Sequence, residues 1–266
     1  MTETKRMKVD NSANPLETHK VECMTVQVYD QRSQMGAAVA AQVGQKIREL
    51  QQDSTRQVRI VFAAAPSQNE LYEGLVQEQG IDWSRVCAFH MDEYIGLADA
   101  APQRFGRYLT DRLFSRVNPG RVELLYGLED TEQECRRYAA LLSEAPIEIV
   151  CLGIGENGHI AFNDPPVADF ADPLQVKAVE LEAACRRQQV NDGCFARLDE
   201  VPTHALTLTV PALMAGRHLY AIVPGASKRS ALQSALRDPV STACPATILR
   251  THPDITMFTD RDAFGL

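Results

Sequence analysis

The sequence predicts an α/β fold, a three-layer α/β/α sandwich built around a mostly parallel, Rossmann-like sheet. Two observations support this prediction. Short runs rich in β-branched residues alternate along the chain with longer segments whose apolar residues recur at helical spacing. The first such run ends at Pro66-Ser67, and a helical pattern follows the turn directly. This alternation is typical of strands that lie parallel in one sheet, with helices covering both faces.

The expected elements follow one another in a regular order. Residues 33–52 are alanine-rich, with apolar residues at helical spacing behind a candidate Ser33 cap, which predicts a first helix. The β-branched run at 58–63 predicts a strand, and a helical pattern resumes at 69–79. Later runs of the same kind predict strands at 85–91, 122–125, 147–152, 204–210, 219–223 and 255–259. The segments between them predict helices at 104–116, 131–143 and 227–236.

The domain organisation is expected to be simple. No internal repeat, low-complexity tract or Pro/Gly/Ser-rich linker divides the chain, so residues 26–266 are expected to form a single α/β domain. That length can bury a sizeable core without disulfides or metal. Residues 1–25 are polar, and no apolar segment follows Lys5, Arg6 and Lys8. We therefore expect a loose N-terminal extension and neither a signal peptide nor a membrane anchor.

Composition and charge argue against several classes of partner. The net charge of −8 argues against nucleic acid as the main partner. The seven cysteines are odd in number, and their spacing matches neither a C-x-x-C motif nor a zinc finger. We therefore expect a cytoplasmic protein without a metal site and without a catalytic cysteine. A small-molecule ligand is the remaining expectation, with no membrane partner.

A glycine-rich segment follows the expected strand at 147–152. Gly153, Gly155 and Gly158 form a G-x-G-x-x-G frame, which could be a dinucleotide-binding loop or a turn that presents His159 to a substrate. A dinucleotide loop needs a long helix after the third glycine, and the paired prolines at 165 and 166 would break such a helix. We therefore favour a glycine turn whose backbone N–H groups face a ligand.

The residues around His159 favour a functional role for it over a structural one. A lone histidine is most often bonded to local backbone, but four polar residues crowd the same turn: Glu156, Asn157, Asn163 and Asp164. An imidazole exchanges protons near neutral pH. His159 is therefore a candidate for proton transfer.

A second candidate group follows the expected strand at 85–91. Asp92 and Glu93 are adjacent carboxylates at the carboxyl end of an apolar strand, where parallel sheets bind their ligands. Repulsion and partial burial favour a raised pKa on one of them, which would make it a usable base. A helix-capping Asp92 beside a solvated Glu93 is the structural alternative, and the pair alone does not decide between the two.

Four motifs in order carry a resemblance to a known family. They are FHMDEYIGL (89–97), GIGENGHIAFNDP (153–165), VPTHALTLTV (201–210) and VPGASK (223–228). Together they resemble the glucosamine-6-phosphate deaminase (isomerase) family, within the wider group that includes 6-phosphogluconolactonases. The match runs in register from about Val58 to Leu236. Lactonases typically carry D-E-R at the strand end and continue G-H-T-A-S, whereas this chain has Asp92-Glu93-Tyr94 and G-H-I-A-F. These differences favour the deaminase side.

The resemblance implies a reaction and a set of roles. Glucosamine 6-phosphate would be converted to fructose 6-phosphate and ammonia, without a metal or an organic cofactor. Asp92 matches the aspartate that moves a proton from C2 to C1, and His159 matches the ring-opening histidine. Asn157 stands where the family usually has aspartate, and Asp164 where it has glutamate. Asn157 can still fix the tautomer of the imidazole, although it cannot stabilise an imidazolium by charge.

The phosphate is expected to bind between two loops. Lys228 opens a helix, where backbone N–H groups and the ammonium favour an anion. The family's second phosphate loop is rich in glycine and threonine, and here only Ser67 keeps a hydroxyl. A phosphate-contacting arginine of the family falls near Gly193. The remaining candidates for substrate contact are Arg187, with Arg186 or Arg197 as alternatives, together with Glu93 and the turn at Gly155 and Gly158.

Two other functions stay open from the sequence. The chain could be a 6-phosphogluconolactonase-type hydrolase, or a sugar-phosphate-binding regulator that lost turnover through Asn157 and the altered phosphate loop. Asp92 and His159 argue against the regulator because both are present. Members of the family are often oligomeric, so a homo-oligomer is also expected from the resemblance.

Overall fold

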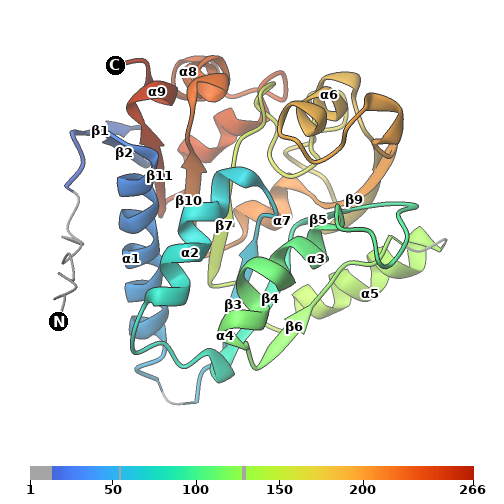
Figure 1. The fold of residues 1–266 in the computed structure, drawn as a ribbon, viewed down its shortest axis with the longest axis horizontal. Coiled ribbons are helices and arrows are strands. Elements are labelled where there is room, and N and C mark those ends of the chain that lie inside the picture. Colours follow the sequence, from blue (N-terminus) through green and yellow to red (C-terminus); the bar gives the residue numbers. More distant parts are fainter. Residues whose placement is uncertain (1–13, 54, 128–129) are drawn as a thin grey trace, which may run out of the picture.

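The structure is a computed structural model that describes residues 14–53, 55–127 and 130–266. In these residues one large sheet has the strand order β1-β2-β11-β10-β7-β3-β4-β6 (Figure 1). Its strands are β1 (Glu17–Val21), β2 (Met24–Tyr29), β3 (Val58–Phe62), β4 (Val86–His90), β6 (Arg121–Glu123), β7 (Ile149–Leu152), β10 (His218–Val223) and β11 (Ile255–Asp260). All neighbours pair in parallel except β1 and β2. The predicted α/β class with a mostly parallel sheet is confirmed.

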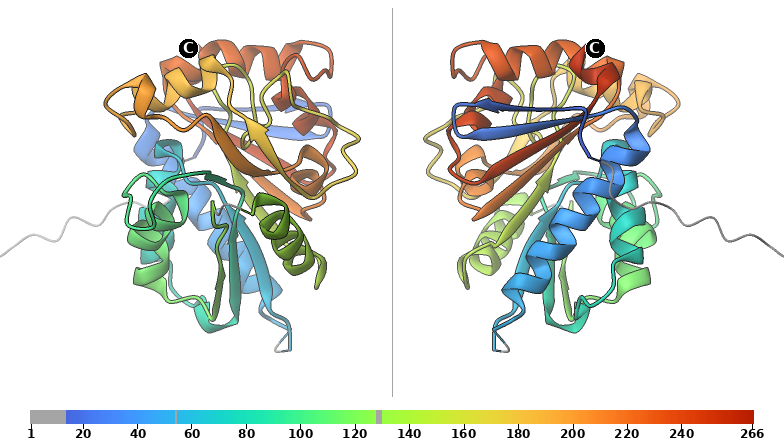
Figure 2. Two further views of the ribbon diagram at one scale, coloured as in Figure 1. Left: turned by 90° about the vertical axis from the view of Figure 1, so that its right-hand side faces the viewer. Right: turned by 90° about the vertical axis from the view of Figure 1, so that its left-hand side faces the viewer.

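Helices cover both faces of the sheet, which makes the three predicted layers. One face carries α1 (Arg32–Leu50), α2 (Asn69–Gln77), α3 (Phe105–Leu109) and α4 (Ser115–Val117), and the other carries α5 (Thr131–Ser143), α7 (Val210–Met214) and α8 (Arg229–Arg237). Figure 2 shows α1 in blue and α5 in yellow-green on opposite sides of the strands.

The central strand β3 explains why the sheet needs two covering layers. All five of its residues are buried, with Ile60 and Phe62 packed in one apolar cluster and Val61 in the other. A strand buried on both faces reads as a continuous apolar run rather than as an alternating one. This property made the strand visible in the sequence.

A second, three-stranded antiparallel sheet lies beside the large one, in the order β5-β9-β8. It contains β5 (Asp92–Tyr94), β8 (Val176–Glu180) and β9 (His204–Leu208), and α6 (Ala183–Asn191) follows β8. The run expected as a strand at 204–210 therefore belongs to this smaller sheet. Its pairing places Asp92 opposite Thr207 and fixes the direction in which β5 leaves the end of β4.

The described part of the N-terminal segment is structured, so the expectation of a loose extension over 1–25 is wrong from Glu17 onward. Strands β1 and β2 form an antiparallel hairpin, with Glu22 in its turn at φ 52°. The sequence of β1, ETHKV, is largely polar because it lies at the edge of the sheet with mostly solvent-facing side chains. Residues 1–13 lie outside the described residues.

Several shorter elements complete the chain. The helix expected over 104–116 is a continuous helical stretch of α3, a π-helical segment (Thr110–Phe114) and α4, and it ends at Asn118 in the left-handed conformation. Short 3-10 turns occupy Pro66–Gln68, Trp83–Arg85, Leu198–Glu200, Ala226–Lys228 and Pro245–Thr251, and α9 (Arg261–Phe264) is the last helix. Elements that the sequence reasoning did not identify are β1, β2, β5, β8, α6, α7 and α9.

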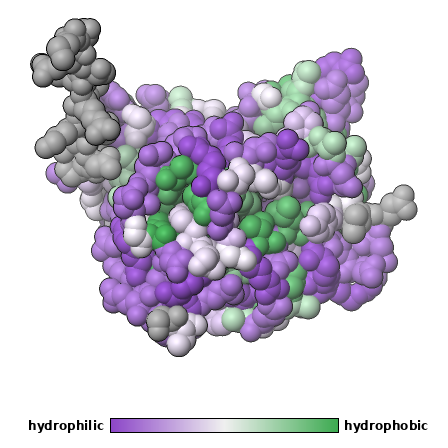
Figure 3. Space-filling model, turned by 60° about the horizontal axis from the view of Figure 1, so that its bottom comes forward, coloured by the Kyte–Doolittle hydropathy of each residue, from purple (hydrophilic) through white to green (hydrophobic). Residues whose placement is uncertain are grey.

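The described surface is mostly polar. On the face in Figure 3, hydrophilic residues predominate and hydrophobic residues form small, separate patches. None of the helices in the described ranges is both long enough and apolar enough to span a lipid bilayer.

Candidate active site

A cleft lies at the carboxyl ends of four parallel strands of the large sheet. Ser67 follows β3, Asp92 follows β4, Gly155 follows β7 and Lys228 follows β10, and all four line the cleft. His159 lines it as well. The topology therefore brings together the acid, the imidazole and the lysine that the sequence analysis placed in one site. Parallel sheets present their ligand-binding residues at this edge.

Asp92 is the acid of the cleft. Its residue surface is 7% exposed, and the strand direction of β5 points its carboxyl group into the cavity. Burial raises the pKa of Asp92 well above its usual range, and the neighbouring charge of Glu93 raises it further. A carboxylate with a raised pKa accepts a proton more readily and can return it, which is the property of a general base.

Glu93 does not contribute to the cleft, so its predicted substrate contact is wrong. Its side chain is fully buried, and its carboxylate accepts hydrogen bonds from the backbone N–H groups of Tyr94 (2.9 Å), Phe105 (3.1 Å) and Gly106 (3.0 Å). Arg104 Nε lies 3.6 Å away. Consecutive residues of a strand point to opposite faces, so Glu93 anchors the start of α3 while Asp92 faces the cleft.

The glycine turn holds the imidazole of His159 rather than a ligand. A Cβ atom at Gly155 would lie 2.1 Å from Cε1 of His159, so the ring packs directly on the glycine backbone. The Gly155 N–H donates to the carbonyl of His159 (2.9 Å), and the Gly158 N–H donates to the carbonyl of Gly155 (3.0 Å). The expectation that these N–H groups face a ligand is therefore wrong, because they close the turn itself.

Nδ1 of His159 lies against two oxygen acceptors. Asn157 Oδ1 lies 2.7 Å from it and Asp164 Oδ1 lies 3.1 Å from it. The amide orientation of Asn157 is defined by its other side, where Nδ2 donates to Asp164 Oδ1 (2.8 Å) and to Glu182 Oε2 (3.2 Å). Because two carboxylates need the NH₂ group, the amide oxygen must face the ring. Nδ1 therefore carries the proton, and Nε2 is the nitrogen available for chemistry.

Asp164 supplies the negative charge of this network. It is 1% exposed, and burial alone would raise its pKa. The hydrogen bond and charge of His159, with further hydrogen bonds from Asn157 and the Cys185 thiol, outweigh burial and hold the pKa of Asp164 below its usual value. Asp164 therefore stays ionised beside the imidazole, as expected for a group that orients a catalytic histidine.

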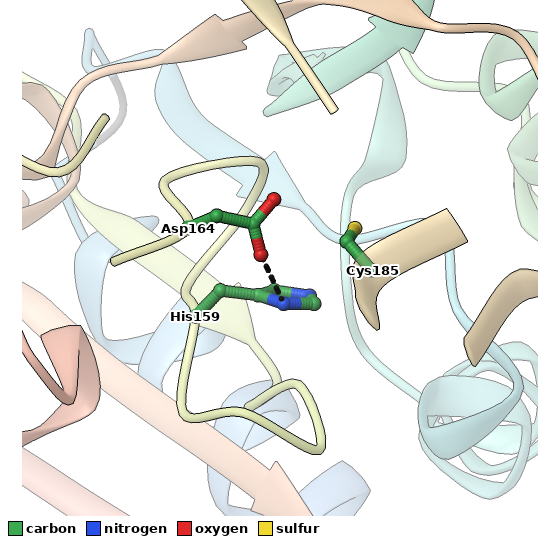
Figure 4. A group of neighbouring side chains, drawn as sticks. All are labelled: His159, Asp164 and Cys185. Carbon is green, nitrogen blue, oxygen red and sulfur yellow. Dashed lines mark ion pairs between the residues drawn. The ribbon is translucent and has the colours of Figure 1, made fainter. Parts of the chain in front are cut away.

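Cys185 completes a compact group with His159 and Asp164, drawn in Figure 4. One ligand-capable atom from each lies within 4.8 Å of the others, so the three residues could in principle hold a metal ion. Burial raises the pKa of the Cys185 thiol, which keeps it protonated, whereas a metal needs the thiolate. The arrangement fits a hydrogen-bonded network better than a metal centre.

Two helix starts also contribute to the cleft. Lys228 ends the 3-10 turn before α8 and is 7% exposed, and burial lowers its pKa. Ser67 lies in the 3-10 turn before α2, and its Oγ accepts a hydrogen bond from Gln68 Nε2 (3.0 Å), which leaves its own proton free to donate. A helix start with a lysine and a hydroxyl suits a phosphate group.

The three arginines considered as replacements for the family's phosphate contact lie outside the cleft. Arg187 lines a different depression, beside Glu156 and Asn157, so its predicted role in the cleft is wrong. Arg186 donates to the backbone carbonyls of Leu198 and Val201 (2.8 Å each). Arg197 forms exposed ion pairs with Asp199 and Glu200.

Sequence reasoning missed several residues of the cleft. Arg32 enters from the start of α1, and Gln188, Gln189 and Asp192 enter from α6 and its end. Gln189 Oε1 accepts from the Tyr94 hydroxyl (2.8 Å), and Gln188 Oε1 accepts from the Glu156 N–H (2.7 Å). Gln188, Gln189 and Asp192 follow no strand of the large sheet, and Arg32 follows β2, which the sequence reasoning had not identified as a strand.

Comparisons with known proteins agree with this site. The family model of "Glucosamine-6-phosphate isomerases/6-phosphogluconolactonase" matches residues 30–257. A glucosamine-6-phosphate deaminase of Listeria monocytogenes is 35% identical over 206 residues, which cover 77% of this chain and 86% of the relative. One of Bacillus thuringiensis is 33% identical over 192 residues, covering 72% of this chain and 71% of the relative.

Solved structures match over most of the chain. A monomeric glucosamine-6-phosphate deaminase superposes with a TM-score of 0.83 at 27% identity, covering 91% of this chain and 99% of that one. A 6-phosphogluconolactonase from Shewanella baltica superposes with a TM-score of 0.73 at 20% identity, covering 91% and 98%, and this likeness concerns the fold alone. The chain therefore belongs to the family of glucosamine-6-phosphate isomerases and 6-phosphogluconolactonases.

Proposed function

We propose that this chain is a glucosamine-6-phosphate deaminase, which converts glucosamine 6-phosphate and water to fructose 6-phosphate and ammonia. The observation that carries the proposal is the convergence of Asp92, His159 and Lys228 on one cleft. The relatives at 33% and 35% identity that bear this name support the same assignment. The chemistry needs a group that opens the sugar ring, a base for C2 and an anchor for the phosphate, and the cleft offers one candidate for each.

Ring opening is the task of His159. With its Nδ1–H bonded to Asn157 and Asp164, the neutral imidazole has its lone pair at Nε2. Nε2 takes the proton of the C1 hydroxyl and delivers a proton to the ring oxygen as the C1–O5 bond breaks, which yields the open-chain aldehyde. The ionised Asp164 stabilises the imidazolium that forms between these two steps.

Proton transfer between carbons is the task of Asp92. Its carboxylate removes the proton from C2 while the C1 oxygen takes up a proton from the ammonium group at C2, which forms an enolamine. The Asp92 carboxyl group then returns its proton to C1, which leaves an iminium ion at C2. Water then adds to C2, and ammonia leaves as the ketone forms. Burial suits Asp92 for this shuttle because the same effect that raises its pKa excludes the water that would exchange the proton.

The direct test is a substrate panel with the purified chain. The proposal expects ammonia release from glucosamine 6-phosphate, together with formation of fructose 6-phosphate. Hydrolysis of 6-phosphogluconolactone without ammonia release would assign the chain to the lactonases instead. Tight binding of sugar phosphates without either reaction would support the regulator. Galacto and manno isomers in the same panel would define the stereochemistry that the site accepts.

Two further properties belong to the same proposal. A cytoplasmic location is supported by the cysteines, because all seven lie in the described residues and are free thiols. Assembly into a homo-oligomer stays a prediction from the family. The structurally similar deaminase is described as monomeric, so the mass of this chain in solution is the measurement that decides.

A further inference from the structure

We infer that Arg32 binds the phosphate group of the substrate, in the role that the family resemblance gives to an arginine near Gly193. This inference rests on the proposed function. Arg32 lines the cleft from the first residue of α1, far in the sequence from the motifs that carry the resemblance. The arginines near Gly193 in the sequence lie outside the cleft. The guanidinium in the cleft therefore comes from Arg32 and not from the position that the family resemblance implies.

The lining of the cleft offers two cationic side chains to an anion. Of the described residues that line the cleft, two are arginine or lysine, namely Arg32 and Lys228. Asp192 also lines the cleft, directly before Gly193. A carboxylate at this place opposes the binding of a sugar phosphate, which carries nearly two negative charges at neutral pH. Lys228 alone would face two acidic residues of the lining, Asp92 and Asp192, so the guanidinium of Arg32 is the second cationic group available to the anion.

The guanidinium of Arg32 is held in place on one side. Nε lies 2.6 Å from Glu70 Oε1, and Nη2 donates to the backbone carbonyl of Pro66. Nη1 has no hydrogen-bond partner in the part of the chain that the structure describes. A guanidinium fixed by two acceptors and open on its third nitrogen is pre-organised for an anion, because little side-chain freedom is lost when the anion binds.

The 3-10 turn after β3 and the first turn of α2 hold Arg32 and also supply a second donor to the phosphate. Pro66 and Glu70 flank Ser67, whose hydroxyl proton is free to donate because Gln68 fills its acceptor side. Proline at 66 has no backbone N–H, so this loop offers one donor fewer than a glycine or threonine turn would offer. The guanidinium replaces the lost donor, which explains why an arginine is tied to this loop.

The test compares Arg32→Ala with a matched control. Arg48 also lies in α1, and its Nη1 is paired with Glu78 at 2.8 Å beyond the end of α2. The two arginines have similar side-chain exposure, 38% and 35%, and each ties the same two helices together. Arg48→Ala therefore reproduces the loss of an ion pair between α1 and the α2 region, but it lies outside the cleft.

Calorimetric titration measures binding without turnover. We expect Arg32→Ala to weaken the affinity for fructose 6-phosphate, in the absence of ammonia, by about ten- to hundredfold. Arg48→Ala should stay within about twofold of the wild type, and inorganic phosphate should show the same order of affinities. Arg32→Lys should recover part of the lost affinity, because lysine keeps the positive charge but lacks the planar guanidinium that can bind two oxygens of the phosphate at once. Thermal melting of both alanine variants controls for folding.

The outcomes separate this inference from the proposed function. If the wild type binds fructose 6-phosphate in an Arg32-dependent way but releases no ammonia from glucosamine 6-phosphate, the function is wrong and the inference holds. If ammonia is released and Arg32→Ala leaves both KM and the affinity for fructose 6-phosphate unchanged, the inference is wrong and the function holds. A wild type that binds neither fructose 6-phosphate nor inorganic phosphate would overturn the inference as well.

Discussion

The amide oxygen of Asn157 lies 2.7 Å from Nδ1 of His159, in a position where a carboxylate would place a full charge against the imidazole. The charge comes instead from Asp164, whose Oδ1 lies 3.1 Å from the same nitrogen. The site therefore keeps the orientation of the ring and retains one charged partner for it, at residue 164.

This relationship predicts the effect of Asn157→Asp on the pH profile. A second carboxylate beside the ring favours the protonated imidazole, so the acidic limb of kcat/KM against pH should move to higher pH by about one unit. Asp164→Asn, which removes the existing charge, should move the same limb to lower pH. An acidic limb that is identical in the wild type and both variants would show that this network does not govern the catalytic proton.

The packing of His159 on Gly155 predicts a strong effect of a single methyl group. In Gly155→Ala the new Cβ would lie 2.1 Å from Cε1 of the ring, so the imidazole must leave its position. We expect ammonia release to fall by about a hundredfold or more, because general acid–base catalysis contributes on that scale. The variant should still fold, as judged by its far-UV circular dichroism.

Gly44→Ala is the matched control for this variant. Gly44 lies in α1, where a new Cβ would meet only the flexible end of Glu78, at 3.0 Å. Its activity should be that of the wild type, since the side chain of Glu78 can move aside. Equal activity in Gly155→Ala and Gly44→Ala would contradict the placement of the ring.

His90 predicts a loss of stability in mild acid. It is fully buried, and burial lowers its pKa from 6.5 to about 3. The unfolded chain takes up this proton below about pH 6.5 while the folded chain does not, so its stabilising contribution is full above pH 6.5 and is lost as the pH falls toward 3. By pH 5 this loss lowers the free energy of unfolding by about 2 kcal/mol.

Urea unfolding at pH 7 and pH 5 measures this loss. The decrease between the two pH values should be smaller in His90→Gln than in the wild type by about that amount, because glutamine does not titrate. His204→Gln, at the exposed start of β9, should behave as the wild type. Equal decreases in all three proteins would show that His90 is not held neutral in the folded state.

The raised pKa of Asp92 predicts that this residue lowers the stability of the folded chain at neutral pH. Its pKa is raised in the folded state, chiefly by burial, so ionisation of this group in the unfolded chain opposes folding at all pH values above its ordinary pKa. Asp92→Asn removes this cost and should unfold at a higher urea concentration than the wild type at pH 7. The difference should vanish near pH 3, where the unfolded chain no longer gains from ionisation.

The sequence predicted the part of the site that follows strands of the large sheet. Ser67, Asp92, Gly155 and Lys228 were located because each follows an apolar run, and the sheet topology does bring these four ends together. Glu93 was misplaced because the two carboxylates were treated as a pair. The alternation of side chains along β5 separates them, and this alternation was not considered because β5 has only three residues.

The remaining site residues were missed because the elements that carry or precede them were not identified from the sequence. Helix α6, AACRRQQVN, is too polar to show an apolar stripe, so Gln188 and Gln189 were not placed on any element. Arg32 follows β2, but the sequence reasoning had not identified this strand and saw only the apolar face of the helix that Arg32 begins. Its position in the cleft depends on how α1 packs beside the loop after β3, which is a tertiary contact and has no counterpart in the spacing of residues.

The measurement that tests the central claim most directly compares ammonia release by the wild type and Asp92→Asn from glucosamine 6-phosphate, with calorimetric binding of fructose 6-phosphate as the parallel readout. The account predicts that the variant loses at least about a thousandfold in kcat while its affinity stays within a few fold of the wild type. Ammonia release by Asp92→Asn at a rate near that of the wild type would contradict the account, because another group would then be moving the proton at C2.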